Sequence, residues 1–223
     1  MMHQPVVDQA VLTFMRSQVA VLDGPLGELE QWAHAKGIPV IPHETVAFLR
    51  QLVALKQPQA ILEIGTAIGF SAALMASVMP KEGHITTIDR YELMYDRAAA
   101  NFKQLGLSNQ ITQKNGDAAD ILPTLTGPYD LIFMDSAKSK YVEFLPECLR
   151  LMAPGGVLLI DDVLQGGTIL WPKDQIEHRN RGIHRKLNEL FATVLPDQTL
   201  YSSVLPLGDG VLMITKIKMG SVK

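Results

Sequence analysis

Residues 60–71 read AILEIGTAIGFS, and this stretch decides how the rest of the chain is interpreted. Its first half is an apolar run that predicts a short buried strand, and an apolar helical pattern begins near Ser71. The turn between them contains Gly65 and Gly69. Strand, glycine turn and helix is how an α/β protein receives a nucleotide-like ligand, because glycines allow close backbone approach and a helix N-terminus presents free N–H groups. An ordinary βα turn is the alternative.

Composition limits the class of protein. The chain has 223 residues, of which 47% are hydrophobic, so one α/β domain can bury a full core. A net charge of −3 indicates no global attraction to nucleic acid or membranes, although a local basic patch remains compatible with it. The one cysteine, Cys148, cannot form an internal disulfide. With no apolar stretch long enough to span a bilayer and no secretion signal, we expect a cytoplasmic protein.

Apolar periodicity predicts three helices before the glycine turn and an alternation of strands and helices after it. The first helices are expected over residues 6–22 and 25–37, and a third stops before Pro58. Further helices are expected over 70–79, 92–105, 119–124, 141–152 and 176–194. Strands are expected at 84–88, 111–114, 129–134, 156–160, 199–205 and 211–217.

This alternation predicts an α/β fold with a Rossmann-like, doubly wound sheet of seven mostly parallel strands. The last two strands are joined by residues 206–210 and predict a C-terminal antiparallel hairpin. We expect one domain over residues 1–223, with added N-terminal helices in 1–57 and the Rossmann-like core in 58–223.

Acidic residues lie at or near the ends of the first three strands of this core. Asp89 ends the second strand, where a carboxylate can accept both ribose hydroxyls of a nucleoside cofactor such as S-adenosylmethionine (SAM) or NAD. Asp117 and the Ala118 N–H could contact an adenine, and Glu63 could hold a positively charged cofactor end. The alternatives are a helix cap for Asp89, a plain turn for Asp117 and a buried, hydrogen-bonded carboxylate for Glu63.

Carboxylates also end the next two strands. Asp135 follows one, and Asp161 and Asp162 follow the other. Three converging carboxylates repel one another unless a cation lies between them, and oxygen ligands favour Mg²⁺, with Mn²⁺ or Ca²⁺ as alternatives. Each acid taken alone could be a cap or a loop anchor. Lys138 could lean over such a cation, which would disfavour its charged form and make it a general base; otherwise it is a solvated surface lysine.

Several motifs together resemble the SAM- and metal-dependent O-methyltransferases of the catechol and caffeoyl-coenzyme A type. They are LEIGTAIGFSA, the Asp89 position, GDA, IFMDSAK-x-x-Y, GGVLLIDDVL and LPLGDGV, within about Ile38 to Lys216. The resemblance implies a class I methyltransferase fold, and a SAM site formed by Glu63, Gly65, Thr66, Gly69, Ser71, Asp89, Arg90, Asp117, Ala118 and Asp135.

The same resemblance implies a divalent ion on Asp135, Asp161 and Asp162, with Lys138 as the catalytic base. One position departs from the family pattern. The third metal ligand is usually asparagine, and here it is Asp162, which adds a negative charge. Homodimerisation is a further expectation from the resemblance.

The residues after the fifth strand bear on the methyl acceptor. Trp171 could stack on a flat substrate or simply pack. Arg179, Arg181 and Arg185 form a basic segment, and helical spacing places His178, Arg181 and Arg185 on one face. Such a face is either solvated or contacts phosphates.

This arrangement resembles the bacterial members that methylate 5-hydroxyuridine in tRNA. We therefore expect tRNA slightly ahead of a free catechol-like molecule as the acceptor. Two other classes remain open at this point: a SAM-binding module without turnover, and an NAD-dependent oxidoreductase. The G-x-x-x-G spacing argues against the oxidoreductase, since a dinucleotide fingerprint reads G-x-G-x-x-G.

Overall fold

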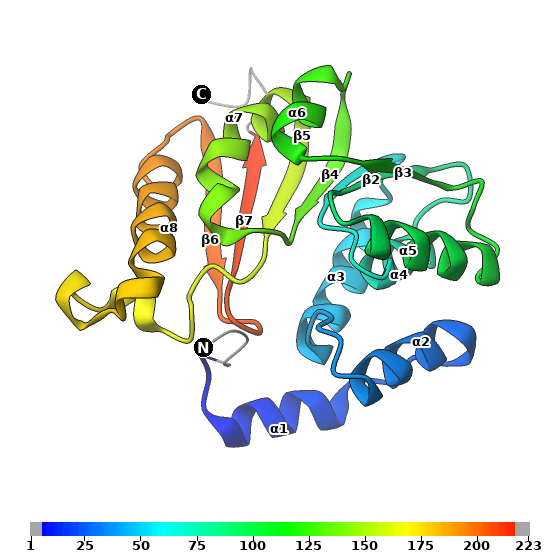
Figure 1. The fold of residues 1–223 in the computed structure, drawn as a ribbon, viewed down its shortest axis with the longest axis horizontal. Coiled ribbons are helices and arrows are strands. Elements are labelled where there is room, and N and C mark those ends of the chain that lie inside the picture. Colours follow the sequence, from blue (N-terminus) through cyan, green and yellow to red (C-terminus); the bar gives the residue numbers. More distant parts are fainter. Residues whose placement is uncertain (1–5, 217–223) are drawn as a thin grey trace. The chain divides into compact units, whose positions relative to one another are not determined.

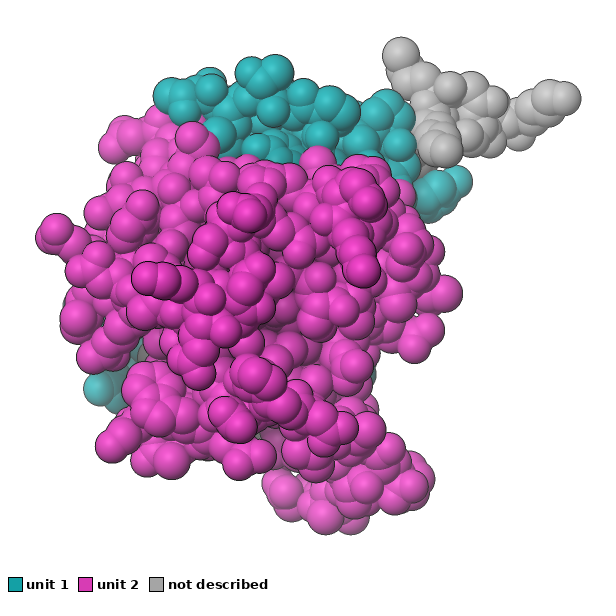
Figure 2. All heavy atoms as spheres, turned by 90° about the vertical axis from the view of Figure 1, so that its right-hand side faces the viewer, with its two compact units in different colours: residues 1–8, 122–223 teal, residues 9–121 magenta. Residues whose placement is uncertain are grey.

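The computed structural model describes residues 6–216 and divides into two compact units. Unit 2 spans residues 9–121, and the described part of unit 1 consists of residues 6–8 and 122–216 (Figure 2). The predicted last residue of the final strand, Ile217, lies outside the described residues. The division into N-terminal helices and one core domain stays a prediction.

Unit 2 begins with three helices, α1 (Gln9–Gln18), α2 (Gly24–Ala35) and α3 (His43–Lys56). Helix α1 is shorter than the predicted 6–22, because Leu12 is its one buried residue and little packing supports further turns. Pro25 lies in the first turn of α2, where its missing N–H costs nothing. Helix α3 ends at Lys56, and its C-cap residue Gln57 has a left-handed conformation directly before Pro58.

The strands of unit 2 are parallel and follow the order β3-β2-β1. Their bounds are β1 (Ala60–Ile64), β2 (His84–Asp89) and β3 (Ile111–Asn115), and they alternate with α4 (Phe70–Ala76), α5 (Glu92–Gln104) and α6 (Ala118–Ile121). Helix α4 ends at Ala76, before the predicted residue 79. The parallel register brings the glycine turn, Asp89 and Asp117 to one edge of this set of strands.

Unit 1 contains β4 (Tyr129–Met134), β5 (Met152–Ile160), β6 (Leu200–Leu205) and β7 (Val211–Lys216), in the order β4-β5-β7-β6. Strands β4 and β5 are parallel, whereas β7 is antiparallel to β5 and to β6. The predicted C-terminal hairpin is therefore confirmed (Figure 1). The carboxyl ends of β4 and β5 carry Asp135 and Asp161, so this parallel pair aligns the predicted acids.

The helices of unit 1 are α7 (Tyr141–Leu151) and α8 (Arg181–Val194), with short 3₁₀ turns η1 (Leu122–Thr124), η2 (Lys138–Lys140), η3 (Thr168–Leu170), η4 (Lys173–Gln175) and η5 (His178–Asn180). Helix α7 packs on β4 and β5, and α8 packs on α7. The predicted helix over 176–194 is wrong at its start. Ile176 is buried in an extended conformation, so regular helix begins only at Arg181.

None of the helices within residues 6–216 is long and apolar enough to cross a membrane.

Candidate active site

The glycine turn of unit 2 is held by the carboxylate at the end of β2. Gly65, Ala67 and Gly69 all have positive φ angles, of 109°, 44° and 82°. The Ala67 N–H donates to Asp89 Oδ2 at 2.8 Å, and the Tyr91 N–H donates to Asp89 Oδ1 at 2.9 Å. A carboxylate has about four acceptor positions, so Asp89 retains capacity for ligand hydroxyls. The N-cap of α5 is Tyr91, so Asp89 does not fill the cap position.

Glu63 is a fully buried carboxylate tied to hydroxyl groups. Its Oε1 accepts from Ser71 Oγ at 2.5 Å, and its Oε2 accepts from Thr87 Oγ1 at 2.5 Å. Because the Thr87 proton is used on Glu63, the 2.6 Å contact between Thr66 and Thr87 has the Thr66 hydroxyl as donor. The structure therefore shows the alternative role, a link between β1, β2, the turn and α4. A direct role in holding the cofactor stays a prediction.

The end of β3 places Asp117 near Arg90. Asp117 Oδ1 accepts from the Ala119 N–H at 2.9 Å, and Arg90 Nη1 lies 3.7 Å from Asp117 Oδ2. The Arg90 guanidinium also lies 5.0 Å from the centre of the Tyr91 ring. Ala118 is buried beside Asp117. These side chains gather at the same edge as the glycine turn, as the sequence predicts.

Substitution of Gly69 tests whether the glycine turn needs a residue without a side chain at this position. A Cβ there would lie 2.5 Å from Phe102 Cε1, and its φ of +82° is strained for an L side chain. Gly69→Ala is therefore expected to cost about 1–3 kcal/mol from overpacking in addition to backbone strain, and to weaken SAM binding. Gly37→Ala is the matched control, because Gly37 has φ +63° but nothing within 4 Å of its Cβ position. Thermal unfolding and SAM titration of both variants check this; equal losses would contradict it.

In unit 1, three carboxylates converge beyond β4 and β5. Asp161 and Asp162 are buried, and the Asp162 N–H donates to Asp161 Oδ1 at 2.8 Å. Burial raises the pKa of Asp161 well above its usual value, and the negative charges of Asp135 and Asp162 raise it further. The pKa of the Tyr141 hydroxyl is also raised. Burial is the largest cause, and the negative charges of Asp135, Asp162 and Asp161 raise it further. The predicted crowding of negative charge is therefore present.

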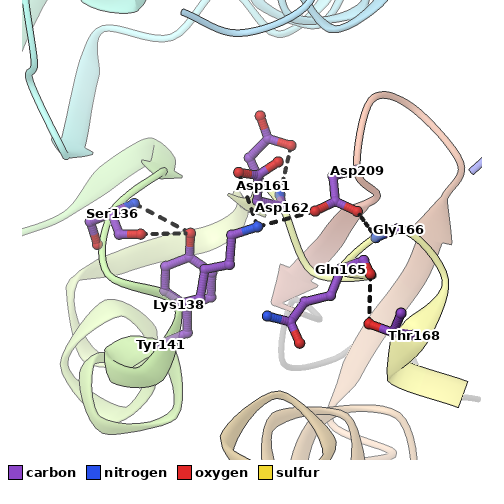
Figure 3. A network of polar contacts seen from close by, with 9 residues as sticks. All are labelled: Ser136, Lys138, Tyr141, Asp161, Asp162, Gln165, Gly166, Thr168 and Asp209. Atoms are coloured by element: carbon purple, nitrogen blue, oxygen red, sulfur yellow. Dashed lines mark hydrogen bonds and ion pairs between the residues drawn. The ribbon is translucent and has the colours of Figure 1, made fainter. Parts of the chain in front are cut away.

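Lys138 supplies positive charge to this cluster (Figure 3). Its Nζ lies 3.2 Å from Asp162 Oδ2 and donates to Asp209 Oδ2 at 3.1 Å. Only 6% of Lys138 is exposed, so it is not the solvated surface lysine of the alternative reading.

Sequence reasoning assigned no role to Asp209 or Tyr141. Asp209 is 1% exposed and also accepts a short hydrogen bond from the Gly166 N–H. The Tyr141 hydroxyl donates to Ser136 O at 3.2 Å and accepts from the Ser136 N–H at 3.3 Å, which fixes the loop after β4 (Figure 3). A signal existed for both, since each lies in a motif that carries the resemblance: GDG for Asp209 and DSAK-x-x-Y for Tyr141.

The donor set fits a hard divalent cation in chemistry, because it consists of carboxylate oxygens that repel one another. Asp162 has φ +59°, a conformation that asparagine and aspartate tolerate better than other L residues. This explains why aspartate can stand where the family pattern has asparagine. Among residues 6–216, however, no three His, Cys, Asp or Glu side chains are already arranged around a metal position.

The predicted substrate residues are only partly brought together. Arg181 lies in α8, where its Nε donates to Ile176 O at 2.9 Å, whereas His178 and Arg179 belong to η5. The prediction that His178, Arg181 and Arg185 share one helix face is therefore wrong. Arg179 is 78% exposed at its side chain and pairs with Glu177.

The other two predicted substrate residues, Arg185 and Trp171, are partly exposed. Arg185 Nη1 lies 3.8 Å from Glu189 Oε2, and the side chain of Trp171 is about half exposed. The Trp171 carbonyl contacts the imidazole of His184 at 3.1 Å. Stacking of Trp171 on a substrate stays a prediction.

Comparison with known proteins decides the family. A model of the O-methyltransferase family matches residues 26–217. The chain is 35% identical over 161 residues to a catechol O-methyltransferase of Niastella koreensis, which covers 70% of this chain and 72% of the relative. The chain belongs to this O-methyltransferase family. It is also 28% identical over 170 residues to a caffeoyl-CoA O-methyltransferase of Stellaria longipes, with 72% and 69% coverage.

Solved structures agree with this family assignment. The O-methyltransferase TomG of Streptomyces achromogenes, solved in complex with SAM, has a TM-score of 0.80 and 26% identity over 93% of this chain and 96% of that chain. The predicted class I methyltransferase fold is confirmed, as is the prediction of a SAM-dependent O-methyltransferase. The readings as an NAD oxidoreductase and as a non-catalytic module are set aside.

Proposed function

We propose that this O-methyltransferase transfers the SAM methyl group to a hydroxyl of a catechol-like small molecule, using a divalent cation. The observation that carries the proposal is the cluster in which Asp135 converges with the buried Asp161 and Asp162 beside Lys138. The names of the catechol and caffeoyl-CoA relatives support the same class of acceptor. Magnesium is the preferred ion, with Mn²⁺ or Ca²⁺ as alternatives.

Asp135, Asp161 and Asp162 would hold the ion. When bound, a divalent cation supplies Lewis acidity that makes an acceptor hydroxyl easier to deprotonate. The neutral amine form of Lys138 takes the proton on its Nζ lone pair, and the ammonium that results is stabilised by Asp162 at 3.2 Å and Asp209 at 3.1 Å. The acceptor oxygen then forms a bond to the methyl carbon as the carbon–sulfur bond breaks, and S-adenosylhomocysteine leaves.

SAM itself is assigned to unit 2 in this proposal. The backbone of the Gly65–Gly69 turn receives the cofactor, Asp89 accepts the ribose hydroxyls, and Asp117 with the Ala118 N–H contacts the adenine. The remaining acceptor positions on Asp89 and the half-exposed Asp117 carboxylate support these roles.

The tRNA acceptor is disfavoured. The side-chain contacts of Arg179 and Arg185 are with carboxylates, and Arg181 donates to backbone carbonyls. The relatives described above are named for catechol and caffeoyl-CoA. Cytoplasmic location and a homodimer stay predictions from the sequence.

An acceptor panel tests the proposal. Labelled SAM and Mg²⁺ are supplied with catechol, with the same ring carrying one hydroxyl, and with tRNA containing 5-hydroxyuridine. We expect label in catechol and far less in the single-hydroxyl compound, because the proposed acceptor class carries two neighbouring hydroxyls. Label confined to tRNA would contradict the assignment to small molecules and give the arginine segment a function.

A further inference from the structure

A single buried carboxylate connects three separate parts of unit 1. Asp209 lies in the turn between β6 and β7, Lys138 lies in η2 after β4, and Gly166 lies in the loop after β5. Asp209 Oδ2 accepts from Lys138 Nζ at 3.1 Å, while Asp209 Oδ1 accepts from the Gly166 N–H (Figure 3). Each oxygen therefore serves a different segment.

The backbone holds this carboxylate in place. The Leu164 N–H donates to the Asp209 carbonyl at 2.8 Å, and the Val163 N–H donates to the Gly210 carbonyl at 3.0 Å. Gly210 has φ +89°, and a Cβ there would clash with the side chain of Leu164. The turn is thus joined closely to the loop after β5, and Asp209 has little freedom to move away from Lys138.

The ammonium of Lys138 has three N–H donors, and the two oxygens within 3.2 Å lie on Asp162 and Asp209. Asp162 is a proposed metal ligand. A carboxylate that ligates a cation is a weaker partner for an ammonium, so Asp209 is the partner that can hold Lys138 throughout the reaction.

We propose that Asp209 is a positioning residue for the methyl transfer: it fixes the amine of Lys138 and the loop after β5 in one arrangement. This inference rests on the proposed function, in which Lys138 takes the acceptor proton. Asp209 itself touches neither SAM nor the acceptor in this assignment.

Asp209→Asn separates the two contacts. The amide has one acceptor oxygen, so it cannot accept from both Lys138 and Gly166, and its NH₂ group faces a donor at one of them. We expect kcat to fall on the order of 10²-fold, since a misplaced reacting group costs that much, with KM for SAM unchanged. Asp197→Asn is the matched control. Asp197 Oδ1 accepts from the N–H and the hydroxyl of Thr199, just before β6, and Asp197 is more exposed than Asp209.

Lysine reactivity supplies a readout that is independent of activity. In the metal-free protein, reductive methylation followed by mass spectrometry reports how firmly Lys138 is held. We expect Lys138 to be protected in the wild type and in Asp197→Asn, and to react faster in Asp209→Asn. If methyl transfer to catechols is absent altogether, this reactivity still tests the positioning role, so the two failures are distinguishable.

Two results would overturn the proposal: an unchanged kcat in Asp209→Asn, or unchanged protection of Lys138. If Asp209→Asn does not fold, Lys138→Met is added to it, with Lys140→Met as control, since Lys140 pairs with Glu143 and is partly exposed. If folding of Asp209→Asn recovers when Lys138→Met is added but not when Lys140→Met is added, the contact between Asp209 and Lys138 is supported. Failure to recover, or equal recovery with Lys140→Met, contradicts it.

Discussion

Replacing Lys138 by methionine is expected to remove nearly all methyl transfer while SAM binding survives. The side chain is buried and paired with Asp162 and Asp209, and it is the proposed proton acceptor. Loss of a general base lowers kcat by roughly 10²–10⁴-fold. Because Lys138 is not among the proposed SAM residues, the SAM dissociation constant is expected to stay the same. Steady-state kinetics and SAM titration measure the two effects.

Lys140→Met is the control for this variant. Lys140 lies two residues away in η2, but its side chain is partly exposed and pairs with Glu143 at 2.8 Å. We expect near wild-type kcat. Comparable losses in both variants would show that the 3₁₀ turn tolerates no substitution and that Lys138 has no special role.

Asp161→Asn has the second-largest expected effect. The substitution is expected to preserve or raise stability in the absence of metal and to lower activity. Burial and neighbouring charges raise the folded-state pKa of Asp161 above its unfolded value of about 3.9. Ionising Asp161 in the folded protein therefore lowers the free energy of unfolding. This loss is absent below the pKa of the unfolded state and grows as pH rises toward the pKa of the folded state. At neutral pH without metal, Asn removes this loss and can still accept from the Asp162 N–H.

The variant is therefore expected to unfold at the same or a higher Tm than the wild type in chelator, where 1 kcal/mol corresponds to about 2–4 °C. Mg²⁺ should then raise the Tm of the wild type by binding the folded state, and raise that of Asp161→Asn less. Activity should fall sharply in the variant. A Tm in chelator that drops by several degrees, together with an equal response to Mg²⁺, would contradict the account of the acidic cluster.

Local signals in the sequence were sufficient where one segment determines its own structure. The apolar run Tyr129–Met134 is a strand with the predicted bounds, and the hairpin after residue 199 forms as expected. The start of α8 was missed because burial of Ile176 is a tertiary effect that helical periodicity does not report.

The polar partners of the site depend on contacts between distant segments. Thr87 meets Glu63 only because the two are opposite each other in the β1–β2 register. Asp209 meets Lys138 across 71 residues of sequence, which places the two in different elements. The sequence shows that these residues are polar and lie in motifs, but the pairing follows from strand order and loop packing.

The most direct measurement of the central claim is the initial rate of methyl transfer from labelled SAM to catechol in enzyme stripped by chelator, followed by titration with Mg²⁺. The account predicts almost no transfer in chelator and recovery as Mg²⁺ is added, with no such recovery in Lys138→Met. Full transfer in chelator would contradict the metal role of Asp135, Asp161 and Asp162.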